Sequence, residues 1–99
     1  MDTKIREHLE GYGYAMVVSV AYNHDSTKVI SGSGDSAIKE WDLRTGTCLV
    51  TLKGHSNYVM SVVYNHDSTK VISGSHDKTI KEWEKKTFTI KNIDDIDKL

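Results

Sequence analysis

An identical internal repeat constrains this sequence more than any other feature. The segments Tyr22–Ser33 and Tyr64–Ser75 both read YNHDSTKVISGS, and they begin 42 residues apart. An aspartate follows each copy two positions later, and both units then continue with Ile-Lys-Glu-Trp. The repeat therefore covers a whole structural unit. A period of about 40 to 45 residues is typical either of four short strands or of a group of helices.

The local pattern favours strands. The first unit has short segments rich in β-branched and aromatic residues at 17–22, 29–33, 37–42 and 48–53. Asn-His-Asp-Ser, Gly-Asp and Arg-Thr-Gly-Thr lie between them, and these are turn-forming sequences. No window spaces its apolar residues by three and four over ten residues, as an amphipathic helix requires. The sequence therefore predicts an all-β chain.

The second unit repeats this layout at 58–64, 71–75, 79–84 and 88–92. Its fourth strand lacks the turn glycine of the first unit, because Phe88 stands where the first unit has Gly46. We therefore expect two four-stranded antiparallel units, and the support is weakest for the last strand.

The segment Leu52–Glu84 closely resembles a WD40 repeat. Gly54-His55 stands where the family's repeats open with Gly-His, and Trp83-Glu84 stands where they close with Trp-Asp. The first unit ends in the standard dipeptide, Trp41-Asp42. The resemblance implies two WD40 blades of a partial, open β-propeller. The expected division is an outer strand of a preceding blade within 1–11, repeat 1 at 12–53, repeat 2 at 54–93 and an acidic tail at 94–99.

The resemblance also implies a structural tetrad that ties the strands of a blade together. In the second unit its members are His55, Ser73, Asp77 and Trp83. The first unit keeps Ser31, Asp35 and Trp41, but Tyr12 stands where the histidine should be. We therefore expect a complete hydrogen-bonded network only in the second unit.

Two glutamates depart from the family pattern. Glu40 and Glu82 lie on the third strand of each unit, where the family usually has an apolar residue. Burying an unpaired carboxylate between blades would be costly. Each glutamate must therefore find a cation or water.

Catalysis and metal binding are not expected. Ser73, His55 and Asp77 could be assembled into a hydrolytic triad, but no G-x-S-x-G motif accompanies them and the tetrad already accounts for them. The repeat itself places His24-Asp25 and His66-Asp67 in equivalent turns, so the five histidines need no metal to explain them. Cys48 is interpreted as a small apolar filler. No cofactor is expected, and we interpret the chain as a non-enzymatic protein-protein interaction or scaffold module. The alternative is a truncated gene fragment without independent function.

Three residues are candidate partner contacts, on the rim that WD propellers commonly use. Met16 lies near the start of the first strand of the first unit, and Tyr58 and Met60 lie near the start of the first strand of the second unit. Tyr58 is the best of these, and ordinary packing is the alternative interpretation. The lysines at 78, 81, 85 and 86 are offset by nearby acidic residues, so a solvated surface rather than a nucleic-acid site is expected.

Nothing in the charge balance indicates a nucleic-acid or membrane-surface partner. The net charge is −1, and no apolar run approaches the roughly 20 residues that span a bilayer, so no membrane partner is expected. One cysteine and the lack of an N-x-[ST] acceptor favour an intracellular, cytoplasmic location.

Two blades alone leave two faces open. A blade packs against a neighbour on both sides, and closed rings have about 4 to 8 blades. Three outcomes remain open from the sequence: a homo-oligomeric ring of three or four copies, docking on another incomplete propeller, or a remnant that folds poorly.

Overall fold

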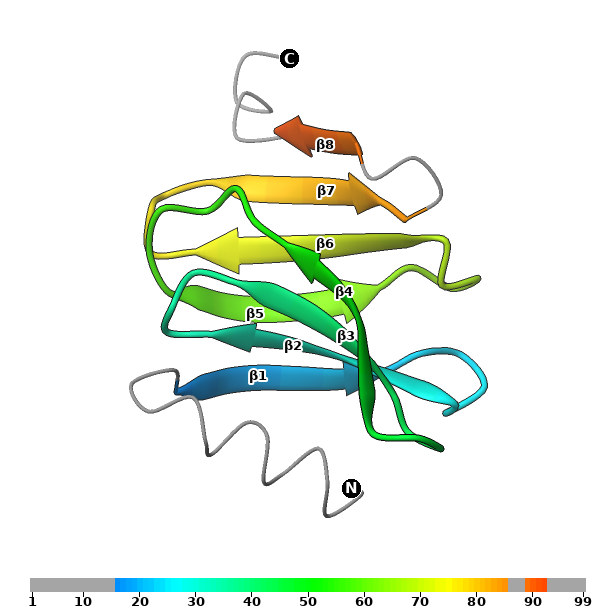
Figure 1. Cartoon of the computed structure of the whole chain (residues 1–99). Helices are drawn as coiled ribbons and strands as arrows, with labels where there is room; N and C mark the ends of the chain where they lie inside the picture. The colour runs from blue at the N-terminus through cyan, green and yellow to red at the C-terminus, as the bar shows by residue number, and fades with distance from the viewer. Residues whose placement is uncertain (1–15, 86–88, 93–99) are drawn as a thin grey trace.

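The computed structural model describes residues 16–85 and 89–92, and these form two antiparallel sheets of four strands each (Figure 1). The first sheet has the order β1-β2-β3-β4 and the second the order β5-β6-β7-β8, so each is a simple meander. The strands are β1 (Val17–Tyr22), β2 (Lys28–Ser33), β3 (Ile38–Asp42), β4 (Thr47–Leu52), β5 (Val59–Tyr64), β6 (Lys70–Ser75), β7 (Ile80–Glu84) and β8 (Thr89–Asn92).

The expected all-β fold of two open four-stranded blades is confirmed. Every strand boundary lies within one residue of the predicted one. β8 pairs with β7 from Lys81↔Asn92 to Glu84↔Thr89, so the fourth strand of the second unit forms even though its turn glycine is missing. We call the sheet β1–β4 blade 1 and the sheet β5–β8 blade 2.

The repeated Asn-His-Asp-Ser-Thr segment forms the first hairpin turn of each blade. In blade 1, Oδ1 of Asn23 accepts hydrogen bonds from the backbone N–H groups of Thr27 and Lys28 at 2.9 and 3.0 Å. Ser26 and Ser68 occupy equivalent positions, with φ of 62° and 61°. Asparagine side chains stabilise such turns by bonding to the backbone a few residues ahead, so identical sequences give identical turns.

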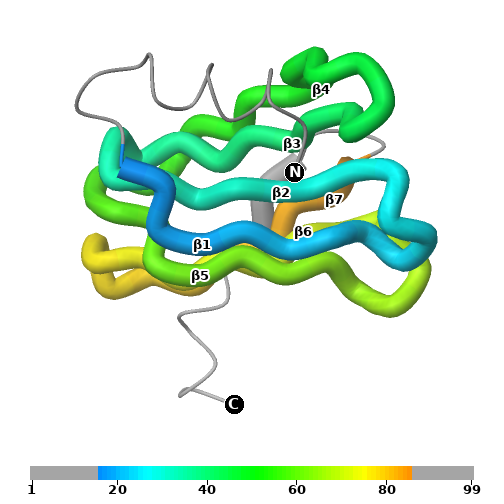
Figure 2. Tube along the Cα trace, turned by 90° about the horizontal axis from the view of Figure 1, so that it is seen from below, coloured from blue at the N-terminus to red at the C-terminus, as the bar shows by residue number. Residues whose placement is uncertain are grey.

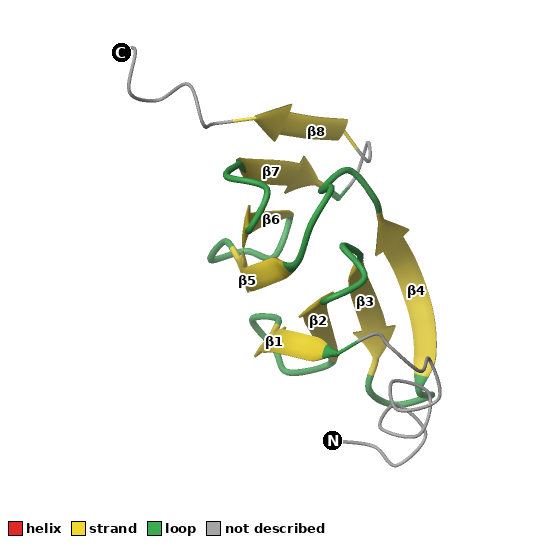
Figure 3. Cartoon of the chain, turned by 90° about the vertical axis from the view of Figure 1, so that its left-hand side faces the viewer, coloured by secondary structure: helices red, strands yellow, loops and turns green. Residues whose placement is uncertain are grey.

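The two blades pack face to face, with β5 lying on β1 and β2. β1 and β5 run side by side (Figure 2), whereas the outer strands β4 and β8 lie farther apart (Figure 3). The blades therefore open like a fan from β1 and β5.

The main core lies between the blades. Ile30, Ile38 and Leu52 of blade 1 contact Val59, Val62, Val71 and Trp83 of blade 2, and all seven side chains are buried. A smaller cluster lies within blade 1, where Val29 and Trp41 are buried against Leu43 and Cys48. The half-buried Cys48 packs there as a filler, in agreement with the sequence interpretation.

Gly32 sets the distance between the blades. A Cβ atom added at Gly32 would lie 2.7 Å from Cγ1 of Val59, which is too close for two carbon atoms. The glycine of the repeated Ser-Gly-Ser therefore lets β5 approach β2 closely.

Some sequence predictions lie outside the described residues: the outer strand expected within 1–11, Tyr12 and His8, Lys86 and Phe88, and the acidic tail at 94–99. The domain boundaries at 12–53 and 54–93 stay predictions. Over 16–85 and 89–92, no helix is long and apolar enough to cross a membrane.

Candidate functional site: the blade network and the rim

A continuous chain of hydrogen bonds links the four tetrad residues of blade 2. The indole Nε1–H of Trp83 donates to Oγ of Ser73 at 2.8 Å. Nε2 of His55 lies 2.7 Å from the same Oγ, and Nδ1 of His55 lies 2.9 Å from Oδ2 of Asp77. The loop before β5, strand β6, the turn before β7 and strand β7 each supply one residue, so the network ties the blade together.

Two of these hydrogen bonds have a direction that the groups themselves fix. The carboxylate of Asp77 only accepts, so Nδ1–H of His55 donates to it. Oγ of Ser73 accepts the indole N–H and lies beside Nε2 of His55, and its hydroxyl has the backbone carbonyl of Lys81 as an acceptor at 3.5 Å. Ser73 is 2% exposed and His55 is 7% exposed, so these bonds form away from solvent, where an unpaired polar group would be costly.

The carboxylate of Asp77 accepts hydrogen bonds from three residues. Besides His55, it accepts the backbone N–H of Ser56 at 3.0 Å, and it accepts both the backbone N–H and the hydroxyl of Thr79. Burial of this carboxyl opposes its ionisation, but the accepted hydrogen bonds outweigh burial and hold the pKa of Asp77 well below its ordinary value. Asp77 is therefore a charged anchor that joins the loop before β5 to the turn before β7.

Blade 1 forms only part of the equivalent network. Nε1–H of Trp41 donates to Oγ of Ser31 at 3.1 Å, and that hydroxyl donates to the backbone carbonyl of Lys39 at 3.4 Å. Asp35 accepts the Ser33 hydroxyl and the backbone N–H of Ala37, both from its own turn. Although burial opposes ionisation, these bonds lower the pKa of Asp35. Asp35 thus organises its own turn, whereas Asp77 also holds the loop before its blade.

Glu40 joins the two blades through polar contacts. Its Oε2 accepts the phenol O–H of Tyr64 at 2.6 Å and lies 2.6 Å from Nζ of Lys85. Nζ of Lys85 also lies 5.2 Å above the Tyr64 ring. Glu40 is 4% exposed, and a carboxylate buried to this extent needs a cation nearby. Lys85 supplies that cation. Burial, the hydrogen bond to Glu40 and the charge of Glu40 raise the pKa of Tyr64, which keeps the phenol a donor.

The expectation of a solvated lysine cluster is wrong for Lys85. Its side chain is 26% exposed and its ammonium pairs with Glu40 across the blade boundary. The sequence indicates that Glu40 needs a cation, but the cation that it finds lies 45 positions away in the other unit. Only the packing of the blades brings the two groups together.

Two of the candidate contact residues, Met16 and Tyr58, lie at the same end of the two blades, and Met60 is the second residue of β5. Met16 directly precedes β1, and Tyr58 directly precedes β5. These two strands run side by side (Figure 2). Their backbone carbonyls accept equivalent hydrogen bonds, from the N–H of Gly34 at 2.7 Å and from the N–H of His76 at 2.9 Å. Met16, Tyr58 and Met60 are 59%, 44% and 43% exposed, so all three present apolar surface to solvent.

His76 is a rim residue that the sequence interpretation missed. Its ring lies 5.7 Å from that of Tyr58, with an angle of 49° between the ring planes. The signal was available, because His76 breaks the repeat by standing where the first unit has Gly34. Tyr58 and His76 together make an exposed aromatic pair that blade 1 lacks.

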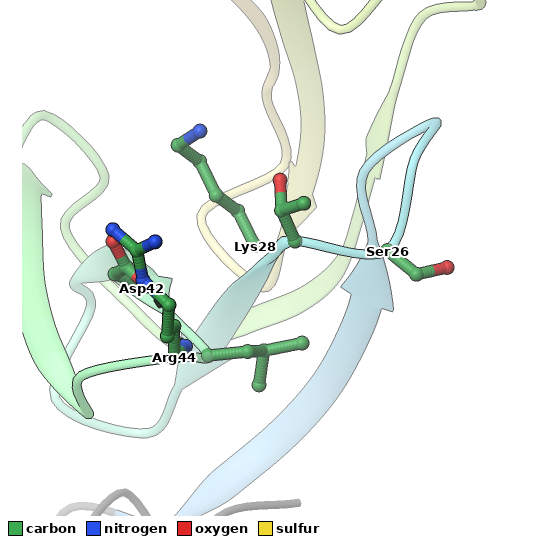
Figure 4. A pocket seen from close by; sticks show the side chains of 6 residues that line it. Ser26, Lys28, Asp42 and Arg44 are labelled. Carbon is green, nitrogen blue, oxygen red and sulfur yellow. Dashed lines mark hydrogen bonds between the residues drawn. The ribbon is translucent and has the colours of Figure 1, made fainter.

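A surface pocket at the turn end of blade 1 has no catalytic arrangement (Figure 4). Lys28, Asp42 and Arg44 line it together with Ser26, Thr27 and Leu43, so its lining contains neither histidine nor cysteine. Among the residues that the structure places, no three histidine, cysteine or acidic side chains are grouped as a metal site would require.

The comparisons with known proteins agree on one family. The family model "WD domain, G-beta repeat" matches residues 3–42 and 46–84. A stretch of 58 residues is 34% identical to Ribosome assembly protein 4 of Saccharomyces cerevisiae and covers 59% of this chain and 11% of that protein. A stretch of 31 residues is 55% identical to the Lissencephaly-1 homolog of Branchiostoma floridae and covers 31% of this chain and 8% of that protein.

The chain therefore spans only a small part of the length of these curated relatives. The family match includes most of both units, and the hydrogen-bonded Trp-Ser-His-Asp network has the residues that the resemblance implies. The chain belongs to the WD40 repeat family.

Proposed function

We propose that this chain is a non-enzymatic, protein-binding scaffold module of the WD-repeat type, which acts in the cytoplasm through the rim that carries Tyr58. The observation that supports this best is the exposed group Tyr58, Met60 and His76, which lies on a blade braced by its own polar network. Aromatic and methionine side chains are enriched in protein interfaces. A rigid blade lowers the entropy cost of presenting them.

The same network argues against hydrolytic chemistry. Ser73 is 2% exposed, and its Oγ already forms hydrogen bonds with the indole of Trp83 and with His55. A nucleophile needs space for a substrate carbonyl beside it and donors for the oxyanion. The serine instead serves as a link between two strands.

A capture experiment tests the binding proposal. The purified chain, its Tyr58→Ala/Met60→Ala variant and its Leu49→Ala variant are immobilised, and the retained cytoplasmic proteins are compared by quantitative mass spectrometry. Leu49 is the matched control, because it is 43% exposed but lies on the outer strand β4. We expect proteins that both the wild type and Leu49→Ala retain and the rim variant loses. Equal retention by all three chains would contradict the proposal.

A direct assay tests the enzyme alternative. Ester hydrolysis is measured with p-nitrophenyl acetate for the wild type and for Ser73→Ala, and bound metal is measured by elemental analysis. We expect no rate difference that depends on Ser73 and no stoichiometric metal. A rate that disappears in a folded Ser73→Ala variant would show catalysis.

A further inference from the structure

We propose that the chain assembles head to tail with further copies of itself, with β1 of one copy packing on β5 and β6 of the copy before it. The chain already contains one such interface, between its own blades. Within the chain, the trailing face of blade 1 (Ala21, Ile30, Gly32, Ile38 and Glu40) packs on the leading face of blade 2 (Val59, Val62, Tyr64 and Ser68).

The repeat places almost the same residues on the two remaining faces. The leading face of blade 1 carries Val17, Val20, Tyr22 and Ser26, which are identical to their blade 2 counterparts. The trailing face of blade 2 carries Val63, Ile72, Gly74, Ile80 and Glu82, where only Val63 differs, in place of Ala21. The leading face of blade 1 and the trailing face of blade 2 are thus the two halves of a second interface of the kind that already joins the two blades.

The exposure of these residues differs sharply from that of their counterparts. Ile38 is fully buried between the blades, whereas Ile80 is 41% exposed. Val62 is 3% exposed, whereas Val20 is 48% exposed. Tyr22 is 61% exposed, although its counterpart Tyr64 is half-buried against Glu40. Val20, Tyr22 and Ile80 thus present apolar surface that the internal interface covers in their counterparts. Val29 and Trp41 of the leading face are already buried, as are their counterparts Val71 and Trp83.

The polar contacts of the internal interface have matching donors and acceptors on the open faces. Tyr64 donates to Glu40 within the chain, so Tyr22 of one copy would donate to Glu82 of another. The backbone N–H of His24 donates to Oγ of Ser68 at 2.9 Å, and this repeats as His66 to Ser26. Figure 4 shows the Ser26 side chain pointing away from the charged side chains of its pocket.

Gly74 supplies the close approach that the assembly needs. A Cβ atom at Gly32 would clash with Val59, whereas a Cβ at Gly74 would meet only Oγ of Ser61, at 3.4 Å. The missing side chain at Gly74 therefore has no tight packing role among the described residues of the chain itself. Val17 of a second copy would lie over Gly74 as Val59 lies over Gly32.

One contact is missing from the proposed interface. Leu43 stands where blade 2 has Lys85, so no equivalent cation faces Glu82 from the next copy. The interface between copies should therefore be weaker than the one within the chain. An interface of this head-to-tail kind closes into a ring when its rotation allows. A ring of about 4 to 8 blades built only from this pair of blades would hold two to four copies.

The experiment uses two blocked variants and light scattering during size-exclusion chromatography. Tyr22→Glu blocks the leading face by placing a carboxylate against Glu82, and Ile80→Glu blocks the trailing face. We expect the wild type to form a closed oligomer and each variant alone to be monomeric. A 1:1 mixture should form a heterodimer only, because one intact leading face and one intact trailing face remain. Leu49→Glu, on β4, is the control and should assemble as the wild type does.

Each other outcome overturns the proposal. A wild type that stays monomeric at the highest soluble concentration shows that another chain, or nothing, covers these faces. Monomeric variants whose mixture forms no heterodimer show that the oligomer uses another surface. Variants that keep the oligomer show the same.

Two conservative variants keep the test valid if a blocked chain fails to fold. Tyr22→Phe removes only the hydroxyl that would donate to Glu82, and it should raise the dissociation constant between copies by about tenfold. Leu43→Lys supplies the missing cation, and it should lower that constant by a similar factor. An unchanged constant in both would contradict the proposed alignment of the faces. Neither result depends on the rim that carries Tyr58, so the binding proposal stands or fails separately.

Discussion

At the scale of single residues, the two blades differ in how their aspartates are used. Asp77 accepts hydrogen bonds from His55, Ser56 and Thr79, and so joins the loop before blade 2 to the turn before β7. Asp35 accepts bonds only from its own turn among the described contacts. The two equivalent aspartates should therefore contribute unequally to the free energy of unfolding.

The first prediction compares Asp77→Ala with Asp35→Ala. Removing Asp77 takes the carboxylate away from the buried Nδ1–H of His55 and leaves it only the more distant Oγ1 of Thr79, at 3.2 Å. The backbone N–H groups of Ser56 and Thr79 lose their acceptor as well, so we expect a loss of about 2 to 3 kcal/mol in the free energy of unfolding. Asp35→Ala should cost about 1 kcal/mol, as loss of a local turn contact does. Thermal unfolding followed by circular dichroism at equal protein concentration measures both. Equal shifts in Tm for the two variants would contradict the assignment.

The second prediction concerns pH. The pKa of Asp77 is lower in the folded chain than in the unfolded one, so its contribution to stability is present above about pH 4 and is lost as the pH falls below that value. Asp77→Asn removes this titration. The urea midpoint of the wild type should therefore fall more steeply than that of Asp77→Asn between about pH 4 and pH 2. Parallel curves would show that Asp77 is not a charged anchor.

At the scale of the strands, the repeat makes elements that look equal but pack differently. β2 and β6 have the same sequence, Lys-Val-Ile-Ser-Gly-Ser, and the same hairpin register with the strands beside them. β2 is covered by β5, whereas the equivalent face of β6 carries no strand of the described chain. Ile30 and Gly32 of β2 are buried, whereas Ile72 and Gly74 of β6 are half-buried. Position in the stack, and not local sequence, decides this difference.

The third prediction uses this difference. Gly32→Ala places a Cβ atom 2.7 Å from Cγ1 of Val59, so β5 must shift and we expect a loss of about 1 to 3 kcal/mol. Gly74→Ala, the identical change in the identical segment, should change the free energy of unfolding by less than about 0.5 kcal/mol at a concentration where the chain is monomeric. Chemical denaturation of the pair measures this. Equal losses would mean that glycine is required by the strand itself.

At the scale of the whole molecule, Glu40 couples the blades. The carboxylate is buried with Tyr64 and Lys85, which belong to the other blade. Breaking a buried ion pair on one side costs more than replacing both partners by apolar residues, because only the first change leaves an unpaired buried charge. The family usually has an apolar residue at the position of Glu40, which makes the replacement sterically reasonable.

The fourth prediction is a double-mutant cycle. Lys85→Met should cost roughly 1 to 3 kcal/mol, since the lysine is partly exposed and the glutamate is not. Adding Glu40→Leu to Lys85→Met should recover most of that loss. Denaturant unfolding of the two single variants and the double variant gives the coupling free energy. Additive effects would show that the contact does not hold the blades together.

The sequence by itself determined the all-β class, the two units and the strand boundaries to within one residue. It could do so because a 42-residue repeat of β-branched segments and Asn- and Gly-containing turns acts through local physics, namely backbone preference and turn hydrogen bonding. The candidate tetrad residues were named from the family resemblance, since each stands at a fixed place in its unit. The expectation that Glu40 would need a cation or water came from the same resemblance.

Only the tertiary structure decided which of two equal faces is buried, which residues answer the charge of Glu40, and where His76 lies relative to Tyr58. Tyr22 and Tyr64 stand in the same sequence, yet one is exposed and the other pairs with a carboxylate from the neighbouring blade. The physical reason is that burial and electrostatic pairing depend on which blade lies against a face. A repeat gives every blade the same faces, and only the order of the blades in space makes them different.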